Sequence, residues 1–169
     1  RGYRLATVKA PITETLAAAL IMLTPWNKDR ILVDPFCGSG TFPIEAAMIG
    51  ANIAPGMNRE FISENWQHIV PRKEWYDAID EAESLVNRDV KMDIQGYDIN
   101  PDAVKAAMEN ARNAEVDQLI HFQQRPLSEL SHRKKYGFII TNPPYGRRLD
   151  GPDEMPALYR EIGDVYRSL

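Results

Sequence analysis

The most constraining feature of the sequence is a short apolar run that leads directly into a glycine turn. Residues 30–34 (RILVD) are followed by residues 35–40 (PFCGSG) and then by a helix-forming segment over about 41–49. An apolar run this short, without polar alternation, is typical of a strand buried on both faces, as in a parallel sheet. The sequence therefore predicts a strand–turn–helix unit whose backbone can approach a ligand closely.

The same alternation of strand and helix continues along the chain. Further strands are predicted at 93–98, 119–124 and 136–141, and helices at 13–23, about 71–90, about 101–114 and about 153–169. Strands that alternate with helices form βαβ units with right-handed crossovers. We therefore expect an α/β fold, a Rossmann-like doubly wound and mainly parallel sheet, in one domain over residues 1–169.

Composition excludes several classes of protein. The 169 residues are 44% hydrophobic, contain no apolar run long enough to cross a membrane, and carry a net charge of −4, which argues against a whole-surface nucleic-acid binder. A single cysteine, Cys37, excludes a disulfide framework and favours a reducing, cytoplasmic compartment. The three histidines have no metal-ligand spacing with Cys37, so no metal site is predicted.

The glycine turn differs from the usual phosphate-binding loops. No Gly-Lys-Ser/Thr follows it, and Thr41-Phe42-Pro43 stand after Gly40 where the dinucleotide fingerprint needs its third glycine. A smaller nucleoside-like ligand is favoured over a dinucleotide, and a nicotinamide-dependent dehydrogenase is disfavoured. The alternative is a plain tight turn.

A second polar position ends the next predicted strand, in the sequence GYDIN at 96–100. Asp98 lies where a carboxylate holds ribose hydroxyls in doubly wound nucleoside sites. The alternative, equally open from these residues, is that Asp98 and Asn100 only cap the following helix.

A third stretch, TNPPYG at 141–146, follows the last predicted strand. Two prolines can continue neither strand nor helix, so the stretch is a stiff loop at the carboxyl end of a strand, where open α/β sheets bind ligands. The Asn142 side-chain oxygen and the Pro143 carbonyl can accept hydrogen bonds from a planar amine, and Tyr145 can stack on a base. A rigid surface turn is the alternative.

The motifs DPFCGSGT, GYDIN and NPPYG, in this order, resemble class I S-adenosylmethionine (SAM)-dependent methyltransferases that act on nucleobase amines. With RGYR, KAPITETLAAAL, IEAAMIGANIAPG, FISENW and NPPYGRRLD, the chain resembles the catalytic domain of THUMP-linked large-subunit ribosomal RNA guanine-N2 methyltransferases. Members of that family are often labelled N6-adenine-specific DNA methylases. The resemblance implies methyl transfer from SAM to guanine N2 of ribosomal RNA (rRNA), and RNA as the partner.

The resemblance also implies roles for individual residues. The methionine part of SAM would be wrapped by one continuous stretch: Asp34, Pro35, Phe36, Cys37, Gly38, Ser39, Gly40 and Thr41. Asp98 would bind the ribose, Ile99 would lie against the adenine, and Pro11 would approach the cofactor carboxylate, whereas Thr13 is assigned as a helix N-cap. The target amine would be held near the methyl group by the loop Asn142, Pro143, Pro144 and Tyr145, with Asn142 also beside the cofactor.

The chain departs from the family pattern in two places. Pro126 stands where an acidic residue that contacts the adenine is expected, and Ser128 or Glu129 are the candidate substitutes. We also expect the last strands and the N-terminal RNA-binding THUMP domain to be missing from this chain, which would leave the fourth strand as an exposed edge and a possible oligomer contact.

Other functions stay open at this point. The same fold could methylate adenine N6 in DNA or a glutamine amide in a protein, or could be an inactive cofactor-binding or assembly module. Arg147 and Arg148 have two equally open interpretations: they contact a phosphate of the substrate, or they are two solvated surface charges.

Overall fold

The computed structural model describes residues 2–5, 11–57, 59–131, 136–145 and 154–168. Within these residues four strands, β1 (Leu32–Asp34), β2 (Ile94–Asp98), β3 (Ile120–Gln124) and β4 (Phe138–Ile139), form one sheet in the order β3-β2-β1-β4. Every neighbouring pair is parallel. The predicted α/β class with a parallel, Rossmann-like sheet is confirmed.

The register brings the carboxyl ends of the strands to one edge. Leu32 is paired with Ile94 on one side and with Phe138 on the other, and Asp34 lies opposite Gly96. Because all strands run the same way, the glycine turn after β1, the segment after β2 and the loop after β4 leave the sheet at this edge. Ligand sites in open α/β sheets lie there.

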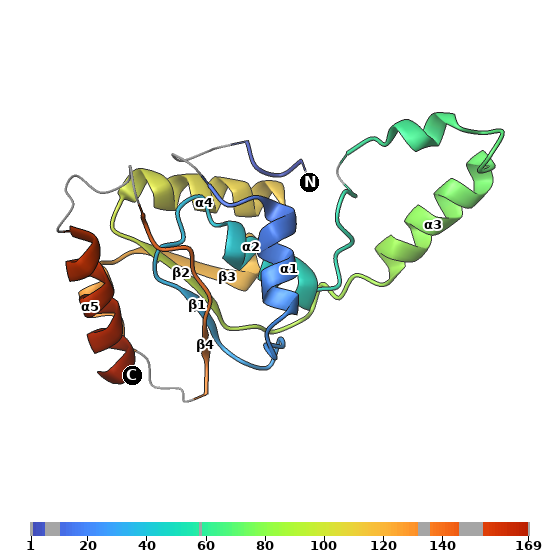
Figure 1. Ribbon diagram of the computed structural model, residues 1–169. Coiled ribbons are helices and arrows are strands. Elements are labelled where there is room, and N and C mark those ends of the chain that lie inside the picture. The colour runs from blue at the N-terminus through green and yellow to red at the C-terminus, as the bar shows by residue number, and fades with distance from the viewer. Residues whose placement is uncertain (1, 6–10, 58, 132–135, 146–153, 169) are drawn as a thin grey trace.

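Alternate residues of the strands face two separate cores, which makes the sheet doubly wound. Leu32 faces a core shared with α1 (Glu14–Met22), α2 (Thr41–Gly50) and α4 (Pro101–Asn113). Ile31 and Val33 face the second core, against which Ile162 and Val165 of α5 (Glu154–Ser168) pack. Figure 1 shows α5 apart from the other three helices. This period of two places the residues of one strand on both faces of the sheet.

The helix ends follow local sequence signals only in part. Asn100 caps α4 as predicted, since its Oδ1 accepts a hydrogen bond from Asp102 N at 2.9 Å, and Pro101 is the first helical residue. Thr13 occupies the N-cap position of α1, but its side chain makes no capping hydrogen bond. The position was therefore predicted, whereas the expected contact is not formed.

The long connection between α2 and β2 projects away from the sheet as an arm (Figure 1). It contains the short 3-10 helix η1 (Ile62–Asn65) and α3 (Arg72–Ser84), which ends six residues before the predicted end at 90. Trp75, Ile79 and Ala82 form an apolar stripe along α3 that is only half-buried, and no residue of α3 is fully buried. Trp75 of the stripe packs edge-on against Phe61, with ring centroids 5.8 Å apart. The arm therefore positions no part of the carboxyl edge.

No helix in the described part of the chain has both the length and the apolar character that a membrane crossing needs.

Candidate cofactor and amine site

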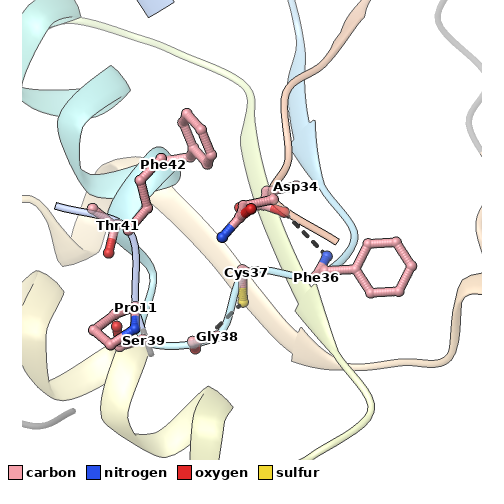
Figure 2. A pocket seen from close by; sticks show the side chains of 10 residues that line it. Pro11, Asp34, Phe36, Cys37, Gly38, Ser39, Thr41 and Phe42 are labelled. Atoms are coloured by element: carbon pink, nitrogen blue, oxygen red, sulfur yellow. Dashed lines mark hydrogen bonds between the residues drawn. The ribbon is translucent and has the colours of Figure 1, made fainter. Parts of the chain in front are cut away.

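One pocket at the carboxyl edge of the sheet joins segments that are about a hundred residues apart in sequence (Figure 2). Its predicted lining residues are Asp34, Phe36, Cys37, Gly38, Ser39, Thr41 and Asn142, and Pro11, which the family resemblance places near the cofactor, lines it too. Ile12 and Phe42 complete the lining and were not predicted. Pro35, Gly40, Asp98, Ile99, Pro143, Pro144 and Tyr145 do not line this pocket. The structure thus brings the glycine turn and Asn142 together, which the sequence could only suggest.

The glycine turn depends on backbone conformations that other residues rarely adopt. Gly38 and Gly40 have φ angles of 54° and 83°, in the left-handed region. A Cβ at Gly40 would lie 3.0 Å from Ala107 Cβ and 3.0 Å from Phe122 Cζ, so the turn is also pressed against α4 and β3. The two glycines therefore let the chain turn tightly between β1 and α2 while the backbone faces the pocket.

Asp34, the last residue of β1, is buried in the pocket wall, and the pKa of its carboxyl is raised. The pKa of its carboxyl is raised from 3.8 to about 7, because burial, with a smaller contribution from the charge of Asp98, outweighs the lowering effect of the hydrogen bonds from Thr141 and Phe36. Its Oδ1 accepts from Thr141 Oγ1 at 2.6 Å and from Phe36 N at 3.1 Å. No ion pair to this carboxylate exists within the described residues.

Thr141 connects the loop after β4 to the strand end that leads into the glycine turn, and the sequence analysis did not identify it. Its hydroxyl bonds to Asp34, and Asn142 follows it directly. The available signal was a polar residue at the end of the apolar run that forms β4. The hydrogen bond joins the ends of two adjacent parallel strands, and so fixes where the loop after β4 begins.

Asp98 makes two hydrogen bonds to the backbone at the carboxyl edge of the sheet. Its Oδ2 accepts from Gly38 N at 2.9 Å, and its Oδ1 accepts from Asn100 N at 2.9 Å. Asn100, and not Asp98, caps α4. Asp98 therefore ties the segment after β2 to the glycine turn, and its neighbour Ile99 is 71% exposed at the same edge.

Cys37 lies in the turn between β1 and α2. Its side chain is buried, and its main-chain N–H donates to Tyr97 O at 2.8 Å. Burial, and then the charges of Asp34 and Asp98, raise the pKa of the thiol well above its usual value. The thiol is therefore protonated and unreactive at neutral pH.

Two further sets of predicted residues do not line the pocket or lie outside the described residues. Ser128 and Glu129, the candidate substitutes for the missing acidic residue, are exposed around the 3-10 helix η3 (Leu127–Glu129), of which Pro126 is the N-cap. Neither lines the pocket. Arg147 and Arg148 lie outside the described residues.

The chemistry of the pocket fits the methionine part of SAM. Ser39 Oγ is buried without a hydrogen-bond partner among the described residues, and the N-cap of α2 is Gly40, which offers no side-chain cap to the first N–H groups. Asp34 adds a buried carboxyl group that has no cationic partner among the described residues. A ligand that carries a carboxylate, an ammonium and a sulfonium complements all three features.

Comparisons with known proteins identify the family of the chain. A family model described as "RMKL-like, methyltransferase domain" matches residues 1–169. The Bacillus subtilis (strain 168) protein named "Putative RNA methyltransferase YpsC" is 46% identical over 169 residues, which are 100% of this chain and 44% of that protein. The "Ribosomal RNA large subunit methyltransferase K/L" of Shewanella frigidimarina (strain NCIMB 400) is 42% identical over 172 residues, 99% of this chain and 24% of that protein.

A solved structure also matches in three dimensions. SMU.472, described as "a putative methyltransferase complexed with SAH" (S-adenosylhomocysteine), superposes with a TM-score of 0.92 at 42% sequence identity, over 99% of this chain and 44% of that one. The chain therefore spans less than half the length of the relatives named here. The fold and the family model together define a Rossmann-like methyltransferase domain. More narrowly, the chain belongs to the RMKL-like methyltransferase domain family.

Proposed function

We propose that this chain transfers the methyl group of SAM to an exocyclic amine of RNA, with guanine N2 in large-subunit rRNA as the target. The observation that carries the proposal is that Asn142 shares one pocket with Asp34 and the glycine turn. The names of the relatives support an RNA substrate. The motif resemblance supports guanine N2, and the single cysteine suits a reducing, cytoplasmic location.

The cofactor half of the proposed site consists of the glycine turn after β1 and the segment after β2. Asp34 to Thr41 would wrap the methionine part, with Pro35 and Gly40 shaping the backbone rather than lining the pocket. Asp98 would hold the ribose with lone pairs left over after its two backbone contacts, and exposed Ile99 would cover the adenine. When bound, SAM supplies an electrophilic methyl group on a positively charged sulfur.

The amine half of the proposed site is the loop after β4. A nucleobase amine is a weak nucleophile because its lone pair is delocalised into the ring. The Asn142 side-chain oxygen and the Pro143 carbonyl would accept its two N–H groups, favour tetrahedral geometry and stabilise the positive charge that develops on nitrogen. The nitrogen would gain the methyl group as the bond from that carbon to sulfur breaks and SAH leaves, and the nitrogen would lose one proton to water.

The rest of the loop would orient the base. Pro143 and Pro144 restrict the backbone, so the accepting carbonyl would keep one direction. Tyr145 is 54% exposed in the same loop as Asn142, and its ring would stack on a base turned out of the RNA.

Replacement of Asn142 tests the catalytic half separately from the cofactor half. We expect Asn142→Ala to lower kcat by about 100-fold or more, because one placed dipole is lost, while the dissociation constant for SAH changes less than threefold. The matched control is Asn87→Ala, an exposed asparagine of the arm. Unchanged turnover in Asn142→Ala would refute the assigned role.

The substrate is tested with SAM labelled in its methyl group. Large-subunit rRNA, DNA and a protein mixture are offered in parallel, and the labelled product is digested and separated chromatographically. The proposal predicts label in N2-methylguanosine. Label only in N6-methyladenine of DNA, or only in protein, would replace the RNA target with one of the two alternatives, and absence of SAH binding would favour a non-catalytic module.

A further inference from the structure

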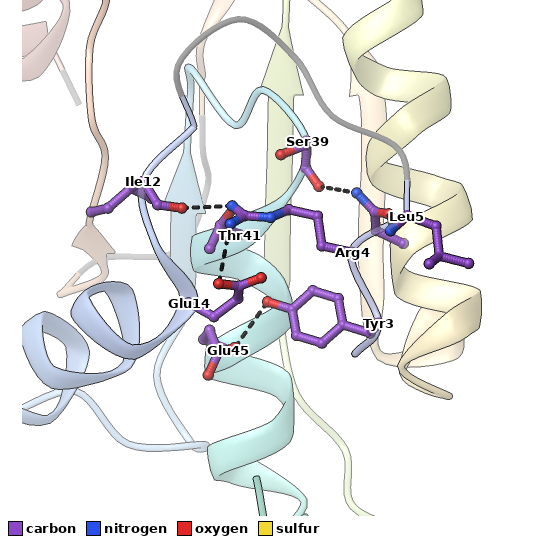
Figure 3. Close-up of polar contacts among 9 residues, drawn as sticks. Tyr3, Arg4, Leu5, Ile12, Glu14, Ser39, Thr41 and Glu45 are labelled. Carbon is purple, nitrogen blue, oxygen red and sulfur yellow. Dashed lines mark hydrogen bonds and ion pairs between the residues drawn. The ribbon is translucent and has the colours of Figure 1, made fainter. Parts of the chain in front are cut away.

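The N-terminal residues 2–5 cross the helical face directly beside the glycine turn (Figure 3). The Tyr3 hydroxyl donates to Glu45 Oε1 of α2 at 2.8 Å, and Leu5 N donates to Asn110 Oδ1 of α4 at 3.1 Å. Burial beside Glu45 raises the pKa of the Tyr3 phenol far above its ordinary value, so the phenol stays a donor. These contacts fix the segment to α2 and α4.

Arg4 is the residue of this segment that reaches the pocket wall. Its Nη1 donates to Ile12 O at 2.6 Å and lies 3.4 Å from Thr41 Oγ1, and its Nη2 lies 3.1 Å from Glu14 Oε2. Ile12 and Thr41 both line the pocket, whereas Arg4 itself does not. Figure 3 shows the Arg4 guanidinium between Ile12, Thr41 and Glu14.

We propose that Arg4 is a positioning residue of the cofactor site, which holds the wall at Ile12 and the first residue of α2 at a fixed separation. The inference rests on the proposed function, since it assigns this pocket to SAM. Without Arg4, the Ile12 carbonyl and the Thr41 hydroxyl lose their common partner. The segment before α1 is then free to move away from the glycine turn, and the pocket loses one of its sides.

The geometry requires arginine rather than any cation. A guanidinium is planar and presents donors in several fixed directions, so one group can serve a carbonyl, a hydroxyl and a carboxylate together. The Arg4 side chain is 14% exposed, and its partner Glu14 is 18% exposed, so water replaces these contacts poorly. A lysine would keep the charge beside Glu14, but as one point donor it cannot reach all three partners at once.

The position of Arg4 relative to Asn142 predicts which kinetic constant changes. Arg4 acts on the wall formed by the N-terminal segment and α2, whereas Asn142 enters the pocket from the loop after β4. Loss of Arg4 should therefore weaken cofactor binding more than it slows methyl transfer at saturating SAM. A purely structural role would instead lower the melting temperature and leave the affinity of the folded protein unchanged.

The experiment measures SAH binding by calorimetry and melting temperature for Arg4→Ala, Arg4→Lys and two controls. We expect Arg4→Ala to weaken SAH binding at least tenfold and Arg4→Lys at least fivefold, with kcat at saturating SAM within threefold of wild type. Tyr3→Phe, in the same segment but bonded to Glu45 outside the pocket, should lower the melting temperature and leave SAH affinity within twofold. Arg88→Ala, which removes exposed ion pairs of the arm, should change neither quantity.

Two outcomes would overturn the proposal. The first is an Arg4→Ala or Arg4→Lys protein that binds SAH within twofold of wild type. The second is an affinity loss in Tyr3→Phe as large as that in Arg4→Lys, because anchoring of the segment alone would then explain the effect. If Arg4→Ala does not fold, Arg4→Lys decides, since it retains the charge beside Glu14. Failure of the RNA substrate proposal leaves this binding measurement unaffected.

Discussion

Removal of the Thr141 hydroxyl should destabilise the protein by an amount that depends on pH. Thr141 Oγ1 donates to Asp34 Oδ1 at 2.6 Å, and Asp34 has a pKa of about 7. A hydrogen bond to an ionised group contributes about 1.5–3 kcal/mol, whereas one between neutral groups contributes about 1 kcal/mol. We therefore expect Thr141→Val to lower the free energy of unfolding by about 1 kcal/mol at pH 5.5 and by about 2 kcal/mol at pH 8.5.

The direction of this pH effect follows from the raised pKa of Asp34. The pKa of the carboxyl is 3.8 in the unfolded chain and about 7 in the folded protein. Between these two pH values the folded state therefore binds the proton more tightly than the unfolded state does. The contribution of Asp34 to stability is therefore greatest below about pH 4 and declines as the pH rises to about 7. Thr141 stabilises the ionised form, so its removal should raise the pKa of Asp34 and extend that decline to higher pH.

Urea unfolding at the two pH values measures the effect, and Thr24→Val is the matched control. Thr24 Oγ1 donates to Ile21 O at 2.7 Å, a carbonyl that does not titrate, so its loss should be the same at both pH values. Equal losses in Thr141→Val at pH 5.5 and 8.5 would contradict the assignment of a titrating Asp34 as the partner.

Two further predictions concern the buried carboxyl and the packing of the sheet. The side chain introduced by Asp34→Asn cannot ionise, so the stability of this variant should no longer fall between pH 4 and 7. In denaturant titrations at pH 8 the variant should be more stable than wild type by up to about 4 kcal/mol. Its SAH affinity should drop because a negative charge is lost. Gly96→Ala should cost about 1–3 kcal/mol, since its Cβ would lie 2.5 Å from Phe122 Cε1, and a melting temperature equal to wild type would show that the ring moves freely.

Much of the fold could be predicted because strand and helix signals in this chain are local. The first strand, the glycine turn and the caps around Asn100 and Pro101 are written in consecutive residues. β4 is shorter than predicted because it pairs only with the three-residue β1 within the described sheet. α3 stops early where the chain bonds to another segment instead: Asn52 Nδ2 donates to Leu85 O at 3.1 Å, and Asn87 N donates to Ala51 O at 2.8 Å. Periodicity alone could not predict these long-range contacts.

The site was predictable where it consists of consecutive motifs, and unpredictable where it depends on contacts between distant segments. The turn from Asp34 to Thr41 and the loop at Asn142 were identified as separate motifs. The bond from Thr141 to Asp34 spans 107 residues, and the contact of Arg4 with Thr41 spans 37. Ile12 and Phe42 carry no polar group that would single them out as lining residues.

By itself, the sequence determined the class of sheet, the order of its strands along the chain and the two motifs that suggest methyl transfer, because each depends on short-range patterns of apolar, glycine and proline residues. Tertiary structure alone decided that these motifs share one pocket, that a buried carboxyl there has a pKa near 7, and that an arginine from the N-terminal segment supports one wall. These properties arise from burial and from distances between segments remote in the chain, and neither quantity is encoded at any single position.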